Sequence, residues 1–260
     1  MRTFSLLVTL SILSLTAQRS ICADATATPS ASPALSTPVA GTPLNLSGDS
    51  SSTGAAAAQE KPSPELLNKY REAAIEMEKK NFDGALVKVD EAQKIAPNNP
   101  NLENLRGAIY TQKKDFAKAT EAFTKASQLD KKSFSPKYNL CELLFLQKKY
   151  PEALTQFQAL QTEDPKNNLV KYKVFLCLLA LDNKPEAEKL LDKMDPFDEL
   201  PVYYFSKAAW DFKNANGTEA KSWLVSARNI YPPQKNALFV DALMELGYLP
   251  RDNPDAPVTK

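Results

Sequence analysis

A spacing of 34 residues recurs through the C-terminal part of this chain and limits the folds that are open to it. Alanine returns at this interval as Ala85, Ala119, Ala153 and Ala187. Residues of one type that recur at a fixed period, here called a column, indicate an array of similar units, each too small to bury its apolar face alone. Three neighbouring columns recur with the alanines: Phe82, Phe116 and Tyr150; Val89, Phe123, Phe157 and Leu191; and Ala92, Ala126, Leu160 and Met194. We therefore predict stacked units that share one continuous core.

Within each period the sequence predicts two amphipathic helices joined by a tight turn. Apolar residues recur at spacings of three and four on both sides of a short polar break, which in the second unit is 113–115. Ser63, Asn99 and Ser135 each stand before a proline, as expected of a capping residue followed by the first helical turn. The unit is therefore a helix–turn–helix, and strands are not expected.

These columns resemble the tetratricopeptide repeat family, in which helix pairs of 34 residues stack into a solenoid. The signature positions of the family are matched in the first unit by Phe82, Ala85, Ala92 and Pro97, in the second by Gly107, Tyr110, Phe116, Ala119, Phe123 and Ala126, and in the third by Leu140, Leu144, Tyr150, Ala153, Phe157 and Pro165. The resemblance implies an all-α solenoid of about five repeats over residues 63–249, closed by a capping helix from Asn236 to Leu249. Phe175 departs from the pattern, because it stands in the small-residue column of Gly107 and Cys141.

The residues before the repeats have the composition of an export signal and a spacer. In residues 1–23, Arg2 precedes an apolar run from Leu6 to Leu15 that is too short to span a bilayer, and cleavage fits after Ala23 or Ala25. Residues 24–62 are dominated by Ala, Ser, Thr and Pro and are expected to form a disordered linker, as is the tail 250–260. Cys22 raises the alternative of a lipid anchor, which its flanking residues do not favour.

The two cysteines of the repeats, Cys141 and Cys177, lie on apolar helical stretches of successive units. We expect both to be small core residues rather than partners in a disulfide, because the helices that carry them are expected to lie too far apart for a bridge.

The family resemblance also implies a concave groove lined by the first helix of each unit, where a peptide or a partner helix binds. Mapped onto this chain, the candidate binding residues are Tyr70, Asn104, Tyr138, Glu142, Tyr172 and Phe205. An aromatic column of this kind suits an apolar peptide with a few polar anchors. The alternative is that these side chains are packed in the core, with Tyr172 and Phe205 under the terminal helix.

Composition argues against catalysis and against nucleic acid as a partner. The chain has no histidine, which excludes Ser-His-Asp, Cys-His and common zinc machinery, and no glycine-rich phosphate loop. A net charge of +1 gives no nucleic-acid footprint. Recurring lysine pairs in the turns, at 79–80, 113–114 and 148–149, form either a basic ridge for an acidic partner or anionic headgroups, or simply solvated turns. Glu142 is left as an isolated candidate general acid.

Together these features predict a periplasmic or secreted scaffold or assembly factor that binds a protein or peptide partner, with no enzyme activity, cofactor or metal and no integral membrane span after signal cleavage. A self-associating structural component of a bacterial envelope, which would be a homo-oligomer, is the first alternative. A hydrolase of envelope polymers that uses Glu142 is the second.

Overall fold

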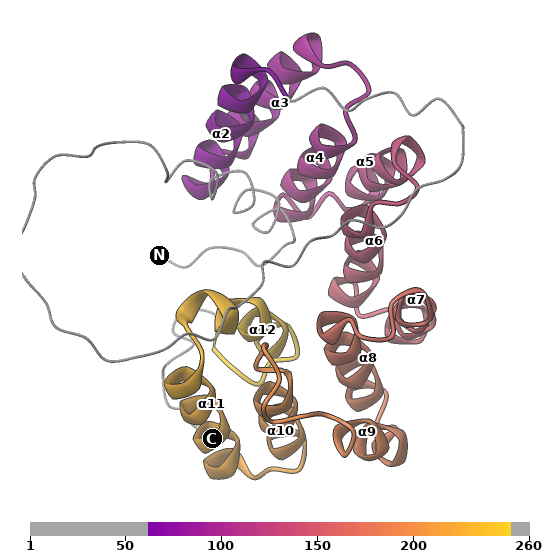
Figure 1. Ribbon diagram of the computed structural model, residues 1–260, viewed down its shortest axis with the longest axis vertical. Helices are drawn as coiled ribbons and strands as arrows, with labels where there is room; N and C mark the ends of the chain where they lie inside the picture. Colours follow the sequence, from indigo (N-terminus) through magenta and orange to yellow (C-terminus); the bar gives the residue numbers. More distant parts are fainter. Residues whose placement is uncertain (1–61, 251–260) are drawn as a thin grey trace, which may run out of the picture.

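The computed structural model describes residues 62–250, which form eleven helices and no strand. The helices alternate between an inner and an outer position along a curved array (Figure 1). Their bounds are α2 (Pro64–Glu78), α3 (Phe82–Ile95), α4 (Pro100–Gln112), α5 (Phe116–Leu129), α6 (Phe134–Leu146), α7 (Tyr150–Glu163), α8 (Asn168–Ala180), α9 (Lys184–Leu191), α10 (Val202–Lys213), α11 (Gly217–Ile230) and α12 (Pro233–Glu245). The predicted all-α solenoid of five helix pairs and a terminal helix is confirmed. The predicted signal, nearly all of the linker and the tail lie outside the described residues.

Most of the helices begin where the sequence places a capping residue. The Ser63 side chain accepts a hydrogen bond from the backbone N–H of Leu66, and Asn99 does the same for Leu102. These contacts satisfy backbone donors that have no partner inside the helix. The third start differs from expectation: α6 begins at Phe134, so Pro136 lies inside its first turn, where a proline is tolerated.

The turn inside each repeat is closed by one residue in the left-handed conformation. This residue is Lys80, Lys114, Lys148, Asp182 or Ala215, with φ between 58° and 62°. Glycine usually occupies such a position because a Cβ atom is disfavoured there. The five turns therefore share one geometry although none of them uses the residue best suited to it.

The seam inside each repeat depends on small residues facing aromatic or branched ones. Ala85, Ala119, Ala153 and Ala187 are all fully buried. A Cβ atom added to Gly107 on α4 would lie 2.5 Å from Cδ1 of Phe123 on α5. At position 107 glycine lets these two helices approach closely, in agreement with the small residue that the column pattern predicts there.

The fourth repeat departs from the others. Phe175, which is fully buried, occupies the small-residue column of α8. Its partner helix α9 has 8 residues, whereas α3, α5, α7 and α11 each have 14. The chain leaves the helix early and continues as a loop of residues 192–201, here called the Phe197 loop, before α10 begins.

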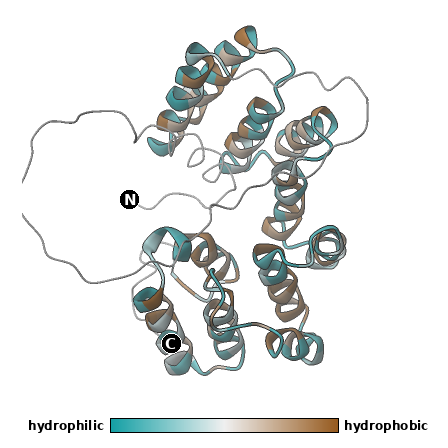
Figure 2. Cartoon of the chain, in the orientation of Figure 1, coloured by the Kyte–Doolittle hydropathy of each residue, from teal (hydrophilic) through white to brown (hydrophobic). Residues whose placement is uncertain are grey.

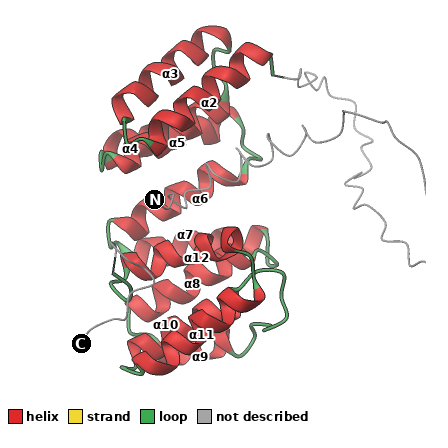
Figure 3. Cartoon of the chain, turned by 90° about the vertical axis from the view of Figure 1, so that its left-hand side faces the viewer, coloured by secondary structure: helices red, strands yellow, loops and turns green. Residues whose placement is uncertain are grey.

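The terminal helix α12 lies inside the curve of the array, where it packs on α10 and α11 and contacts α8 (Figure 1). It runs from Pro233 to Glu245, so it begins three residues before the predicted start and ends four residues before the predicted end at Leu249. Its apolar residues join those of α8, which is mostly apolar along its length (Figure 2). Seen from the side, α2 to α5 form one end of the array and α8 to α12 the other, so α12 does not reach the first repeats (Figure 3).

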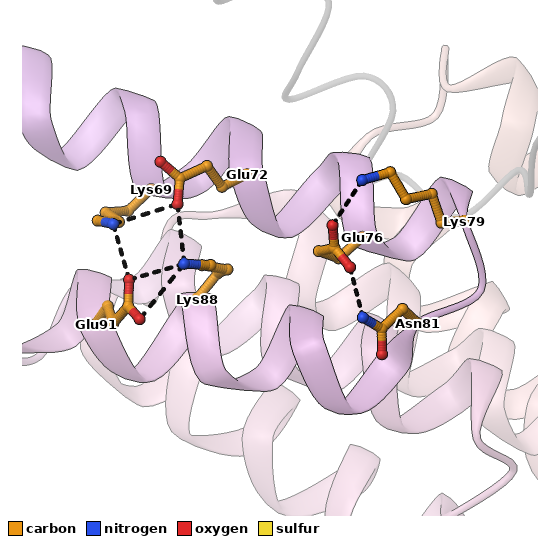
Figure 4. Close-up of polar contacts among 7 residues, drawn as sticks. All are labelled: Lys69, Glu72, Glu76, Lys79, Asn81, Lys88 and Glu91. Atoms are coloured by element: carbon orange, nitrogen blue, oxygen red, sulfur yellow. Dashed lines mark hydrogen bonds and ion pairs between the residues drawn. The ribbon is translucent and has the colours of Figure 1, made fainter.

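The first repeat carries a cluster of four charges, here called the end cluster: Lys69, Glu72, Lys88 and Glu91 (Figure 4). Lys69 Nζ lies 2.8 Å from Glu91 Oε2 and 3.2 Å from Glu72 Oε2, and Lys88 Nζ lies 3.2 Å from each of the two carboxylates. Residues 103 and 106, which are 34 positions after Lys69 and Glu72, contact α3 of the preceding repeat. The end cluster thus places ion pairs on the face that another repeat would cover.

Candidate functional site

The six candidate binding residues lie on the first helices of the five repeats, and all six are buried. Tyr70 is on α2, Asn104 on α4, Tyr138 and Glu142 on α6, Tyr172 on α8 and Phe205 on α10. Their exposed fractions run from 0% for Tyr172 to 8% for Tyr70 and Glu142. The structure therefore distributes them over successive first helices as buried side chains and does not display them as an open aromatic ladder.

Tyr138 is packed in the core of the third repeat. Its ring lies 5.6 Å from the ring of Phe134 on the same helix and 5.6 Å from that of Phe157 on α7, centroid to centroid. Burial, assisted by the charge of Glu142, raises the pKa of the Tyr138 hydroxyl well above its ordinary value. This tyrosine therefore packs between α6 and α7 as a core residue.

Tyr172 and Phe205 lie beneath α12. The Tyr172 hydroxyl donates a hydrogen bond of 3.2 Å to the carbonyl oxygen of Phe239, and the two rings meet edge to face at 5.0 Å. Phe239 also stacks on Phe205, with ring centroids 5.4 Å apart. In this arrangement the chain's own terminal helix occupies the position of a groove ligand over α8 and α10, so a partner could contact either residue only if α12 moved.

Asn104 and Glu142 each join their helix to the next inner helix. Asn139 Nδ2 on α6 donates to Asn104 Oδ1 on α4 at 2.9 Å. Lys173 Nζ on α8 lies 2.7 Å from Glu142 Oε1 and 4.5 Å from the ring centroid of Phe145. Lys173 is 3% exposed, so this is a buried ion pair with an added cation–π contact. Because a one-turn slip would separate both pairs, they fix the register of successive repeats.

Three polar atoms along the inner face of α2 and α6 lack a hydrogen-bond partner. They are the hydroxyl oxygen of Tyr70, Oδ1 of Asn139 and Oε2 of Glu142, and each is buried. Desolvation raises the pKa of the Tyr70 hydroxyl to about 12, so it remains a donor at neutral pH. A buried polar atom without a partner costs about 1–3 kcal/mol, and such atoms are few in folded proteins. Some of this unused hydrogen-bonding capacity therefore lies in the half of the array that α12 does not cover.

Sequence reasoning missed Lys173, Asn139 and Phe239, which make most of the contacts at this face. Lys173 had a signal, because it is a charged residue in the middle of the apolar run of α8 and follows Glu142 by 31 residues, one repeat less one helical turn. The other two had none, since Asn139 is one polar residue among many and Phe239 has the character of any apolar residue on an amphipathic helix.

The turn lysines do not form an unbroken basic ridge. Lys79 pairs with Glu76 at 2.8 Å, and Lys113 pairs with Asp83 of the preceding repeat. Among residues 62–250, no ion pair involves Lys80, Lys114 or Lys148. The turns thus carry separated, solvated charges.

Two depressions lie away from the inner face. A cavity of about 320 Å³ between α5, α6 and α7 is lined mainly by Leu140, Leu143, Leu144 and Leu160. Another of about 470 Å³ between α3, α4 and α5 is lined by charged residues that already pair with one another, Arg106 with Asp90 and Lys125 with Glu103.

The described residues were compared with the requirements of a metal site and of a membrane-spanning helix. Between residues 62 and 250, no group of three or more His, Cys, Asp or Glu side chains could hold a metal ion. In the same range no helix combines the length and apolar character that crossing a bilayer requires. Cys141 and Cys177 are buried and unpaired, as predicted.

Comparison with known proteins agrees with this geometry. Residues 110–174 match the sequence profile of the tetratricopeptide repeat. This segment belongs to the tetratricopeptide repeat family. No curated protein matches its sequence.

Two solved structures resemble this chain in fold. One is a tetratricopeptide repeat protein from Parabacteroides merdae, 17% identical, with a TM-score of 0.50 over 71% of this chain and 75% of the other. The second is PilF from Pseudomonas aeruginosa, 16% identical, with a TM-score of 0.51 over 73% of this chain and 87% of the other. At these identities the likeness establishes the fold alone.

Proposed function

We propose that this tetratricopeptide repeat protein is an exported scaffold or assembly factor that binds a peptide or helix of a partner protein on the inner face of α2, α4 and α6. Phe239 closes the other half of this face by packing on Tyr172 and Phe205. A partner segment would therefore lie across the first three repeats and end against α12, which acts as the boundary of the groove.

The observation that carries the proposal is that Tyr70, Asn139 and Glu142 each keep a buried polar atom without a partner, which a bound segment would satisfy once these side chains turn toward it. An extended peptide presents backbone N–H and C=O groups at regular intervals, and these can pair with a hydroxyl donor and with amide and carboxylate acceptors. Half-buried apolar residues of α2, Leu67, Ala74 and Met77, supply adjoining contact area. The site thus combines apolar area with a few polar anchors, as peptide sites do.

Export is part of the proposal because of the sequence before the repeats. The positive start at Arg2, the apolar run from Leu6 to Leu15 and the small residues around Ala23 have the order of a cleaved signal. The spacer at 24–62 would then join the mature N-terminus to the repeats, and the partner would belong to the periplasm or the extracellular space.

The proposal is tested by selecting peptides from a random library displayed on phage against the full chain. Tyr70→Phe removes only the unpaired hydroxyl, so it should leave the melting temperature unchanged or raise it. The same variant should lower the affinity for the selected peptides several-fold. Tyr110→Phe, on the same type of helix but outside the candidate column, is the matched control.

Peptides whose affinity is insensitive to Tyr70→Phe and to Met77→Trp would contradict the inner-face site. A single stable oligomer in light scattering after size exclusion, with no peptide selected, would favour self-association instead.

A further inference from the structure

Phe197 is the most exposed large apolar side chain among residues 62–250. Its exposed fraction is 91%, whereas the other exposed residues of this kind range from 38% for Leu181 to 56% for Ile230. It lies on the Phe197 loop between α9 and α10, away from α2, α4 and α6 (Figure 1). Exposing an entire phenylalanine opposes the hydrophobic effect, so its position calls for a physical reason.

The loop holds Phe197 in this position by hydrogen bonds from three directions. The Tyr231 hydroxyl donates to the carbonyl oxygen of Asp198 at 2.8 Å, and Lys235 Nζ donates to that of Glu199 at 2.7 Å. Asn168 Nδ2 on α8 donates to Asp198 Oδ2 at 2.6 Å. The loop is therefore tied to the start of α8 and to the junction between α11 and α12.

Residues on either side of Phe197 strengthen this anchoring. The backbone N–H of Phe197 itself donates to Asp195 Oδ1 at 2.8 Å. Before it, Met194 is buried, and after it Val202 is buried at the start of α10. Phe197 thus projects from a loop whose neighbouring residues are pinned, so little conformational entropy remains to be lost when the ring binds.

The surroundings of Phe197 are acidic. Residues 192–199 contain four carboxylates, Asp192, Asp195, Asp198 and Glu199, and one lysine, Lys193. Asp192, Asp195 and Glu199 are exposed. Lys235 adds one further positive charge at the edge of the loop. A surface that receives this loop must therefore bury one aromatic ring and face an excess of negative charge.

We propose that Phe197 is the anchor of a second docking surface, which inserts into an apolar pocket rimmed by lysine or arginine on a partner protein. Pre-organised aromatic side chains are the usual energetic centres of interfaces, and charge complementarity speeds association and orients the partners. Anionic membrane surfaces do not fit, because the loop would be repelled from their headgroups. This surface is separate from the inner face, so the two could be occupied at once.

The test places the photo-crosslinking amino acid p-benzoylphenylalanine at position 197 of the full chain in its native cells. Position 225 is the matched control, since Val225 on α11 is also an exposed apolar residue, at 51%. We expect a crosslinked protein from position 197 but not from 225. Mass spectrometry should map the crosslink to apolar residues of that protein flanked by lysine or arginine.

The captured protein is then purified and titrated against variants of the full chain. Phe197→Ala should weaken binding about 30-fold or more, the loss expected of an anchor residue, with an unchanged melting temperature because the side chain is exposed. Val225→Ala should have no effect. Glu199→Gln should slow association, and added salt should do the same.

Three results would overturn the proposal: crosslinks at 197 no stronger than at 225, crosslinks to a second copy of this chain or to lipid, or a mapped site without basic residues. Met77→Trp on the inner face should leave the crosslink at 197 intact. Failure of the inner-face proposal and failure of this one are therefore distinguishable.

Discussion

The contact between Gly107 and Phe123 gives the sharpest test of how the repeats are held together. A Cβ atom at position 107 would lie 2.5 Å from Cδ1, 2.6 Å from Cε1 and 2.9 Å from Cγ of the Phe123 ring. Ordinary carbon–carbon contact begins at about 3.5 Å, so the ring would have to retreat by about 1 Å. Phe123 is fully buried, and its rigid ring has little room to do so.

The magnitude of Gly107→Ala follows from two opposed effects. Overpacking of this kind destabilises by about 1–3 kcal/mol. Replacing a glycine within a helix by alanine contributes about 1 kcal/mol in the other direction. We therefore expect a net loss of up to about 2 kcal/mol, which for a domain of this size lowers the melting temperature by up to about 8 °C.

Gly217 provides the matched control, because a Cβ atom there would meet nothing within 4 Å. Gly217→Ala should be neutral or slightly stabilising in the same calorimetric or circular dichroism melt. A double-mutant cycle adds Phe123→Leu, which should be partly rescued by Gly107→Ala because the added methyl fills the space released. The reasoning is refuted if Gly107→Ala raises the melting temperature as Gly217→Ala does.

Three other predictions follow from the contacts described above. In urea titrations, Lys173→Met should lower the free energy of unfolding by about 3 kcal/mol, because the Glu142 carboxylate then stays buried without its cation. Adding Glu142→Leu to this variant should restore most of the lost stability. Lys114→Gly should raise the free energy of unfolding by about 1 kcal/mol, since the residue has φ 60°, and an unchanged melt would contradict this. Burial raises the pKa of the Cys141 and Cys177 thiols from 9.0 to about 12, so stability should fall between about pH 9 and 12, where only the unfolded chain loses these protons. Fast alkylation of the native thiols by iodoacetamide at neutral pH would count against that burial.

The fold could be predicted from the sequence because its periodic residues have one physical role. Ala85 and Ala119 recur because the two helices of a repeat must approach closely at these buried positions. A fold without such repeated helix contacts would not explain why alanine returns at this spacing. The short length of helix α9 was harder to predict. Phe175 indicated that the fourth repeat is irregular. The sequence pattern did not show, however, how many residues the second helix of that repeat would lose.

The binding face was harder to predict because periodicity does not distinguish a packed side chain from a displayed one. Tyr138 recurs at the right spacing for a groove, yet it fills a hole beside Phe157. Tyr172 is covered by Phe239, which lies 67 residues later, as the alternative interpretation predicted. The sequence could not decide between the two interpretations, because no pattern in α12 indicates where that helix packs. Phe197 lies in a loop outside every column, so a prediction based on repeats assigns it no role.

The end cluster on the first repeat has a consequence for how copies of this protein meet. A second array that tried to continue the solenoid from α2 and α3 would have to strip water from Lys69, Glu72, Lys88 and Glu91 and break the pairs that they make. Growth into a filament at that terminus therefore requires an incoming repeat whose side chains pair with these charges. Anyone lengthening the array by design would first have to give these four side chains polar partners on the added repeat, as Gln93 and Asp90 provide for Glu103 and Arg106.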